Sequence, residues 1–485
     1  MKLKSLFYTV LTTALLLNLC SCSKNDETDI SSGNGNRSQR NSQQNQTDYT
    51  VFEFVHSISY YYYLWNSNIP SQSSSSYYSQ FEDPEEMFET FIDSRDRYSF
   101  VMNNYSEVYS ELDNDYSTDG INYSLYYGDS NKSTVIATVN YVYDDSPAQS
   151  AGIKRGDVIT AIDGTTLTPS NYQELLAKTS YTLTYKKIVT DDEGEISYSS
   201  DTYTSSLITK KQMTINPILQ NKLITRNGKR IGYLLYDSFT MSATEIVDAC
   251  EKLQSWQIDE LVLDLRLNSG GYVSTLDTLA SLIVPEGNAG KVFIQSVYNS
   301  YLTQYYKKYQ NEMDQDPFYT YFTEQNANLN LKRLYVLTSN TTASASEELI
   351  SGLKPYMDVI LIGETTTGKY TSCYLINDDE DEGSDSNGIP YSEWAVYLVV
   401  GSCTDSNGNM DFENGWTPDY EIEDTYCYEL GDEEEPLLAQ ALTLIDGGSI
   451  AKRTTQKFQK NSNYIGNYGK PEVLKQLIIT HDDFI

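Results

Sequence analysis

Apolar and polar residues alternate most regularly between residues 231 and 447. Short apolar runs such as "RIGYLLY" and "LVLDL" are typical of buried strands, and the segments between them repeat apolar residues every three or four positions, as amphipathic helices do. In the first such segment, Ser242 and Glu245 predict a capping box at the start of the helix. Strands that alternate with helices predict an α/β domain with a largely parallel sheet, and we assign residues 231–447 to it.

The residues before this domain follow two different patterns. Residues 49–115 carry apolar side chains at helical spacing, with acidic residues near the expected helix starts, and predict a small helical domain. Residues 116–190 alternate as strands do and contain turns with glycine, so they predict a second, strand-rich domain. Residues 191–230 are expected to be linker strands, and residues 448–485 a polar C-terminal tail. The predicted fold class is therefore α+β and multidomain.

The N-terminal segment predicts export and anchoring. Lys2 and Lys4 precede an apolar stretch that is too short to span a bilayer, so residues 1–21 are expected to be a signal peptide. The "LCSC" that ends it resembles a bacterial lipobox with Cys22 as the acylated residue, and "SKNDE" after it resembles the acidic export tags of surface lipoproteins in the Bacteroidetes. The alternative is an ordinary cleaved signal with incidental cysteines. Residues 22–48 lack apolar periodicity and are expected to form a flexible tether.

Composition narrows the possible functions. The 485 residues include 34 Lys and Arg against 68 Asp and Glu, a net charge of -34, which would repel nucleic acid and anionic lipid surfaces. We therefore expect no nucleic-acid partner, and a lipid anchor as the only membrane contact. After Cys22, four cysteines remain without CxxC spacing and there are two histidines, so no metal is expected. The sequence leaves open whether Cys250, Cys373, Cys403 and Cys427 are free or form disulfides.

The segment "TTASASEELI" places a candidate nucleophile, Ser344, where an apolar strand gives way to a helix. Neither histidine suits the role of base, because His56 lies among apolar residues of the helical domain, where we expect it to pack, and His481 lies in the tail. A lysine can serve instead if burial keeps it neutral. Its pKa must then fall from about 10.4 toward neutrality, at a cost of roughly 4 kcal/mol that apolar surroundings can impose. Lys369 in "GETTTGKYTSC" follows an apolar strand and is expected to be that lysine.

The stretch "SPAQSAGIKRGDVITAIDG" in the strand-rich domain resembles the signature of PDZ domains. That resemblance implies that a peptide C-terminus adds as a strand to the domain, with its carboxylate held by backbone N–H groups of a loop. The matching peptide-binding loop comprises Gly120, Ile121, Asn122 and Tyr123, with Asn122 in place of the family's usual second glycine. The alternative is that residues 116–190 act only as a structural spacer.

The two catalytic candidates resemble the paired motifs of the C-terminal processing, or tail-specific, serine peptidases, in which a serine in a "SASE" context pairs with a lysine in "GE-x-x-x-GK". The resemblance implies Ser344 as nucleophile, Lys369 as general base, and a catalytic domain with a ClpP/crotonase-like core. Some members carry an assisting aspartate about eleven residues after the serine, at a position that Pro355 occupies here. Taken alone, Ser344 and Glu347 would indicate only a capping box, and we expect Glu347 to orient the site or cap the helix.

The stretch "DLRLNSGG" supplies candidate donors for an oxyanion. It places Gly270 and Gly271 between a strand and a helix, and it resembles the family's "DLR-x-N-x-GG". We expect backbone N–H groups of Gly270 or Gly271 and of Ala345 to form the oxyanion hole, although a glycine pair before a helix is also common in simple turns. The motif "DSNGNMD", residues 405–411, has oxygen ligands at alternate positions but lacks the glutamate of a calcium loop, which favours a solvated turn.

Together these motifs predict a lipid-anchored serine endopeptidase that acts outside the cytoplasm, at the periplasmic face or the cell surface of a bacterial outer membrane. Its expected partners are polypeptide substrates, including those recognised through free C-termini, and it needs no cofactor. The PDZ domain would recognise the substrate or gate the site. Two alternatives remain: a catalytically silent member of the same fold that binds peptides or other ligands, and an adaptor that uses only the PDZ domain.

Overall fold

The computed structural model describes residues 49–112, 114–190, 196–313, 315–379, 381, 383–449 and 464–470. The expected signal peptide, the lipidation site Cys22, the tether of residues 22–48 and His481 lie outside these described residues. Within them, every helix is too short or too polar to cross a bilayer.

A six-stranded sheet forms the centre of the fold, with its strands in the order β13, β14, β15, β18, β19, β22. The hairpin β13–β14 is antiparallel and the other neighbours are parallel, which confirms the predicted α/β domain with a largely parallel sheet. The segment expected to be a linker, residues 191–230, contributes the edge strand β13. The strands span Ile218–Arg226 (β13), Lys229–Tyr236 (β14), Glu260–Asp264 (β15), Arg333–Thr338 (β18), Asp358–Gly363 (β19) and Tyr420–Glu421 (β22).

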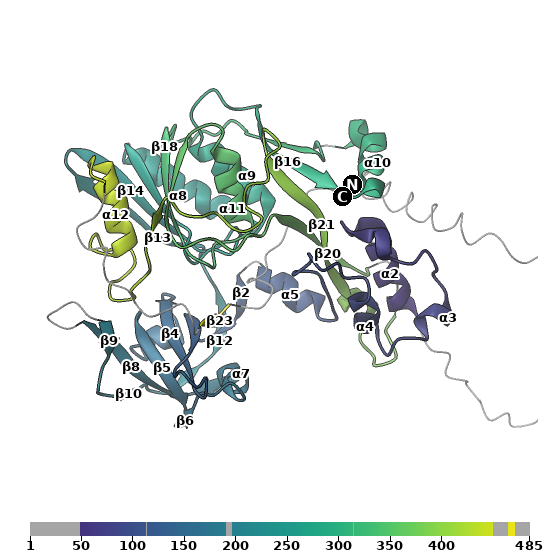
Figure 1. Cartoon of the computed structure of the whole chain (residues 1–485), viewed down its shortest axis with the longest axis horizontal. Helices are drawn as coiled ribbons and strands as arrows, with labels where there is room; N and C mark the ends of the chain where they lie inside the picture. Colours follow the sequence, from purple (N-terminus) through teal and green to yellow (C-terminus); the bar gives the residue numbers. More distant parts are fainter. Residues whose placement is uncertain are drawn as a thin grey trace, which may run out of the picture.

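Helices cover both faces of this sheet (Figure 1). Successive residues of a strand point to opposite faces, so Leu234 joins a core cluster with α8, α9 and α11, whereas Leu235 joins a second cluster with α12. The helices span Thr244–Ser255 (α8), Val273–Ile283 (α9), Ala345–Leu353 (α11) and Pro436–Ile445 (α12).

The start of α8 differs from the sequence prediction. This helix begins at Thr244 with Ala243 as its N-cap, and the Ser242 hydroxyl accepts the Thr244 N–H at 3.2 Å. Glu245 is therefore the second helical residue instead of the third, and the predicted capping box of Ser242 and Glu245 does not form.

A second sheet joins the N-terminal helices to the rest of the fold. Its strands follow the order β1, β21, β16, β17, and β20 also pairs with β21. These strands span Phe100–Met102 (β1), Val292–Tyr298 (β16), Tyr319–Tyr321 (β17), Thr371–Asn377 (β20) and Ala395–Asp405 (β21). The helical elements near them are α2 (Thr50–Tyr62), η1 (Asn66–Asn68), α3 (Ser75–Tyr78), α4 (Pro84–Glu89), α5 (Tyr105–Leu112), α10 (Ser300–Tyr309), η2 (Gln310–Glu312) and η3 (Tyr391–Glu393).

The N-terminal helices do not form the separate domain that their spacing predicted. Their buried residues belong to the same apolar cluster as those of β20 and β21, and β1 pairs directly with β21. The reason is that residues 49–115 bury their apolar faces on a sheet from the second half of the chain. His56 packs within this cluster, with Nε2 2.8 Å from the carbonyl oxygen of Pro70, so its expected packing role is confirmed.

The strand-rich domain is the blue part of Figure 1, and its main sheet has the order β10, β8, β5, β4, β3, β23. The last strand, β23 (Tyr464–Tyr468), comes from the segment predicted to be a polar tail. The other elements span Asp115–Thr118 (β2), Ile121–Tyr127 (β3), Val135–Val142 (β4), Pro147–Ser150 (α6), Asp157–Ile162 (β5), Thr165–Thr166 (β6), Tyr172–Ala177 (α7), Ser180–Tyr181 (β7), Leu183–Thr190 (β8), Ile196–Tyr198 (β9), Tyr203–Thr204 (β10), Ile208–Thr209 (β11) and Lys211–Thr214 (β12). β2 and β12 pair where the chain enters and leaves this domain.

Candidate active site

Ser344 lies at the turn from β18 into α11, as predicted. It is the N-cap of α11 and only 6% exposed, and it forms the predicted capping box with Glu347. Its φ is +53° and its ψ −119°, which is a backbone conformation that residues with a side chain rarely adopt. Such strain persists only where the surroundings enforce it, and it is concentrated at functional sites.

The Glu347 carboxylate ties the two candidate catalytic segments together. It is fully buried and accepts the backbone N–H of Ser344 at 3.0 Å and that of Lys369 at 2.8 Å, both on Oε2. Oε1 accepts the Gly368 N–H at 2.7 Å and the Thr366 hydroxyl. The backbone nitrogens of Ser344 and Lys369 are thus within two hydrogen-bond lengths of each other. Burial raises the pKa of the Glu347 carboxyl, and these hydrogen bonds partly offset that rise.

Lys369 is buried, as expected, with 1% of its surface exposed. Its Nζ donates to the Tyr397 hydroxyl at 3.0 Å and lies 4.6 Å from the ring centre of Tyr98. Burial lowers the pKa of Lys369, and the nearby Cys373 thiol and Glu348 carboxylate partly oppose that effect. The lysine therefore has the environment that favours an uncharged amine.

Three side chains around Lys369 escaped the sequence analysis. Tyr98 comes from the N-terminal segment, and Tyr397 and Cys373 from β21 and β20. Their only common feature is proximity to Lys369 in space, and no spacing in the sequence marks them. In addition, the Glu348 carboxylate accepts the Cys403 thiol at 3.0 Å, which makes Glu348 a second buried carboxylate close to the site.

The glycine pair before α9 packs directly against the turn that holds Ser344. A Cβ atom on Gly270 would come within 2.8 Å of the Ser344 Cβ and 3.0 Å of the Ala345 nitrogen. The N–H of Gly270 already donates to Asn268 Oδ1 at 2.8 Å. By contrast, no acceptor in the described part of the chain takes the N–H of Gly271 or of Ala345. Of the two glycines predicted as alternatives, Gly271 is the one whose N–H is available.

Arg266 anchors the base of this glycine loop in a buried ionic network. Its guanidinium, 2% exposed, contacts Asp264 at 2.9 Å and Glu435 at 2.8 Å. It also lies 3.3 Å from Asp424, which pairs in turn with Arg155 of the strand-rich domain. The two arginines hold the pKa of the Asp424 carboxyl well below its usual range. These buried ion pairs give Arg266 a structural role at the base of the loop.

Replacing Arg266 with methionine is expected to lower the free energy of unfolding by about 3–5 kcal/mol, because Asp264 and Glu435 would keep buried charges without their partner. Urea unfolding followed by circular dichroism measures this loss. Arg333→Met is the matched control, since Arg333 and Asp358 form a 3.6 Å pair whose side chains are 42% and 74% exposed. Its loss should stay below about 1 kcal/mol, and equal losses in the two variants would contradict the role given to Arg266.

The predicted peptide-binding loop uses part of its donors internally. Gly120, at φ +85°, abuts Ser146, and a Cβ atom there would lie 2.1 Å from the Ser146 Cβ. The Gly120 N–H donates to the Thr118 hydroxyl at 2.9 Å, and the Ile121 N–H donates to Asp119 Oδ1 at 2.8 Å. Asn122 Oδ1 accepts the Asn140 amide at 2.8 Å. Two of the N–H groups expected to hold a terminal carboxylate are thus already occupied.

The structure also describes two other features that the sequence singled out. Cys250, Cys373, Cys403 and Cys427 are all free thiols. The Asp405 carboxylate accepts the backbone N–H groups of Asn407 and Asn409, each at 2.8 Å, which closes residues 405–411 into a turn. Within the described residues, no group of three or more His, Cys, Asp and Glu side chains is arranged to hold a metal ion.

Known proteins share both halves of this architecture. Residues 230–422 match peptidase family S41, and residues 138–187 match a PDZ domain. The carboxyl-terminal-processing protease of Picosynechococcus sp. is 30% identical over 225 residues, which are 46% of this chain and 48% of that protein. The carboxy-terminal processing protease CtpA of Bacillus subtilis is 25% identical over 279 residues, 57% of this chain and 51% of that protein. The alignments therefore span about half the length of these relatives.

A solved structure extends the likeness over most of the chain. A candidate S41 protease from Bacteroides fragilis matches with a TM-score of 0.65 and 26% identity, covering 81% of this chain and 97% of that one. The family and the domain order expected from the motifs are thereby confirmed. We conclude that residues 230–422 form a peptidase domain of family S41 and that a PDZ domain precedes it in the chain.

Proposed function

We propose that the protein is a serine endopeptidase of the C-terminal processing type, with Ser344 as nucleophile and Lys369 as general base. One observation carries the proposal: a single buried carboxylate, Glu347, accepts the backbone N–H groups of a strained serine and of a buried lysine. That arrangement holds a hydroxyl and an amine at fixed positions in a place where water is scarce.

In the proposed reaction, Ser344 Oγ attacks the carbonyl carbon of the scissile peptide bond while its proton passes to Lys369 Nζ. The tetrahedral intermediate collapses when Lys369 returns that proton to the departing amine, and an ester on Ser344 remains. Lys369 then removes a proton from water, which attacks the ester carbonyl. As the ester bond breaks, Lys369 passes that proton to Ser344 Oγ, and the new C-terminus is released. Lys369 must be uncharged at the start of acylation and again at the start of deacylation. Its burial beside Tyr98 and Tyr397 favours the uncharged form.

The developing oxyanion needs hydrogen-bond donors that are not already engaged. We propose the N–H groups of Gly271 and Ala345, since Gly270 donates to Asn268. Gly270 has a different role in this proposal. Its missing side chain leaves space for the close approach of the glycine loop to Ser344 and Ala345.

The proposed location is outside the cytoplasm, with a lipid on Cys22 as the anchor. The N-terminal sequence supports this, since its two lysines, short apolar stretch and "LCSC" have the order of a lipoprotein signal. The net charge of -34 suits a site where neutral or basic unfolded polypeptides are the substrates.

Labelling with a serine-directed fluorophosphonate tests the proposal. We expect the purified protein to cleave an unfolded polypeptide and to lose that activity as one phosphonyl group attaches, with peptide mass mapping placing the group on Ser344. Ser346, two residues further on, donates to the Asn268 carbonyl at 3.2 Å and should remain unmodified. A phosphonyl group on another serine that accompanies the loss of activity, or full activity after Ser344 is modified, would overturn the assignment.

A further inference from the structure

The PDZ sheet of this protein already carries an added strand, and that strand is its own. Without β23 the sheet would end at β3, the strand that includes Ile121, Asn122 and Tyr123 of the predicted peptide-binding loop. β23 pairs antiparallel with β3, with Tyr468 opposite Tyr123 and Asn467 opposite Ser124. An extended peptide binds to an exposed sheet edge in the same manner. We call residues 464–470 the strap.

Side chains of the strap match the edge strand as a ligand would. The Tyr468 ring stacks on that of Tyr123, with centres 5.5 Å apart and planes 12° apart. The Ser124 hydroxyl donates to Asn467 Oδ1 at 2.7 Å. Ile465 packs on the apolar core of the PDZ domain. Aromatic, polar and apolar contacts thus all fix one register.

Gly469 lets the strap pass over the predicted peptide-binding loop instead of ending there. Its φ is +104°, and a Cβ atom would lie 1.9 Å from the Ile121 carbonyl oxygen and 3.0 Å from the Asn122 Cα. The N–H groups of Gly120 and Ile121 are engaged within the loop. The edge is therefore built to take an internal extended segment, with glycine at the crossing point.

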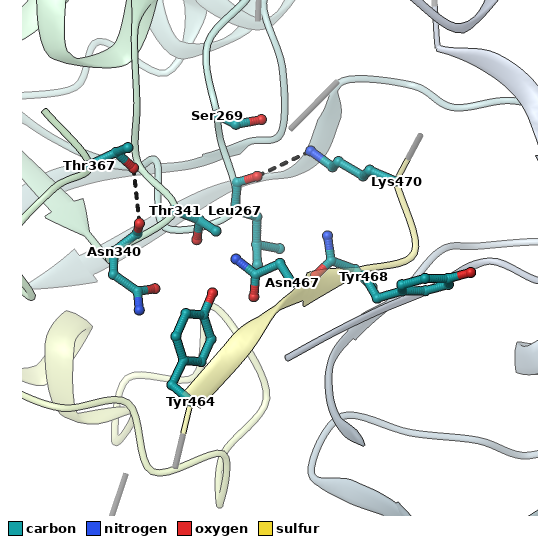
Figure 2. A pocket seen from close by; sticks show the side chains of 10 residues that line it. Leu267, Ser269, Asn340, Thr341, Thr367, Tyr464, Asn467, Tyr468 and Lys470 are labelled. Carbon is teal, nitrogen blue, oxygen red and sulfur yellow. Dashed lines mark hydrogen bonds between the residues drawn. The ribbon is translucent and has the colours of Figure 1, made fainter. Parts of the chain in front are cut away.

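Beyond the crossing, Lys470 fastens the strap to the peptidase domain. Its Nζ pairs with the buried Asp237 carboxylate at 2.8 Å and donates to the Leu267 carbonyl at 3.1 Å. Leu267 belongs to the loop that leads to Gly270 and Gly271. Figure 2 shows this contact at the margin of a cavity of about 220 Å³, which Ser269, Thr341 and Thr367 line from the peptidase side.

We propose that the strap is an internal ligand of the PDZ edge strand and that extended segments of unfolded polypeptides compete with it. Segments with aromatic side chains opposite Tyr123 and Tyr126 fit best, since Tyr468 and Tyr464 occupy those positions now. When a competitor replaces the strap, Lys470 leaves the Leu267 carbonyl and the glycine loop loses one of its restraints. This last step rests on the proposed peptidase function, whereas the competition for the edge does not.

A pair of glycine variants tests the competition. Gly469→Ala places a Cβ against the Ile121 carbonyl, whereas Gly466→Ala, three residues earlier on the same strap, meets open space and is the matched control. Both are made in the full chain with Ser344→Ala, so that no probe is cleaved. The probe is a fluorescent peptide with the strap sequence YIGNYGK. We expect Gly469→Ala to bind it about tenfold more tightly than Gly466→Ala, because apparent affinity scales with the fraction of molecules whose edge is open.

Amide hydrogen exchange across β3 gives a second readout that needs no peptide. Exchange in β3 should be faster in Gly469→Ala than in the control, while the rest of the PDZ sheet keeps its protection. If Gly469→Ala unfolds the domain, Lys470→Gln, which weakens the strap without adding a Cβ, serves in its place. Binding and exchange equal to those of Gly466→Ala would overturn the proposal.

The link to catalysis is measured separately with Ser344 intact. Gly469→Ala is expected to change the rate of polypeptide cleavage several-fold relative to Gly466→Ala. An unchanged cleavage rate together with tighter probe binding would contradict the effect of the strap on the glycine loop. It would still support the strap as an internal ligand of the PDZ edge strand. If the protein has no peptidase activity, probe binding and amide exchange still test the strap. Failure of the proposed peptidase function and failure of the strap proposal are therefore distinguishable.

Discussion

Replacing Ser344 with alanine is expected to lower the rate of polypeptide cleavage by about 10⁴-fold or more, since no covalent intermediate can form without the hydroxyl. The fold should persist, because the Glu347 carboxylate would still accept the backbone N–H groups at positions 344, 368 and 369. Cleavage of an unfolded, fluorescently labelled polypeptide measures the rate, and thermal unfolding checks the fold.

Ser346→Ala is the matched control for this result. This variant removes the Ser346 hydroxyl in the first turn of α11. That hydroxyl donates to the Asn268 carbonyl at 3.2 Å and has no assigned part in the reaction. Its rate should stay within about tenfold of the parent, the effect of one neutral hydrogen bond. A Ser344→Ala protein that cleaves as fast as Ser346→Ala would favour the alternative of a peptide-binding protein without this chemistry.

Replacing Lys369 with methionine is expected to lower the cleavage rate by about 10²–10⁴-fold, the usual contribution of a general base. The fold should not weaken, because methionine suits the apolar pocket formed by Tyr98 and Tyr397 and carries no charge to bury. Lys354→Met is the control, since Lys354 is exposed and its Nζ lies over the Trp416 ring. An equal loss of activity in Lys354→Met would contradict the role of Lys369 as general base.

The dependence on pH follows from the lowered pKa of Lys369. The uncharged amine is the active form, so the cleavage rate should rise with pH and level off below about 10.4, where an exposed lysine titrates. The free energy of unfolding should also depend on the protonation of Lys369. Between the lowered folded pKa and the ordinary unfolded one, the unfolded chain binds more protons, so the free energy of unfolding rises with pH there. Lys369→Met should abolish that rise, and an unchanged slope would contradict the lowered pKa.

The parts of the site that are local in sequence could be predicted, and those built by distant segments could not. Ser344 and Glu347 lie within one helix start, so their capping geometry follows from the sequence alone. Lys369 lies six residues after the end of β19, and its burial could be inferred from that apolar strand. Tyr98, by contrast, reaches Lys369 from the other end of the described chain, and only the packing of the N-terminal helices on β20 and β21 places it there.

The fold shows the same division. Alternating strands and helices predict the parallel sheet. Residues 191–230 are predicted only as linker strands, because the edge strand β13 has mixed burial and its sequence does not assign it to that sheet. The strap lies in the segment predicted to be a polar C-terminal tail without a role, since its polar residues give no apolar period. Its place depends on an unpaired strand edge in another domain, and nothing near residues 464–470 in the sequence signals that edge.

Tyr98 also has a consequence for the order in which a newly made molecule becomes competent. The ring that shields the Lys369 amine belongs to a segment synthesised early, whereas the amine and Tyr397 belong to strands made much later. Until both ends have docked, the amine is open to water, which favours its protonated form. On the proposed mechanism, a partly folded molecule therefore lacks a working base, and peptidase activity begins only when the N-terminal segment has packed on β20 and β21.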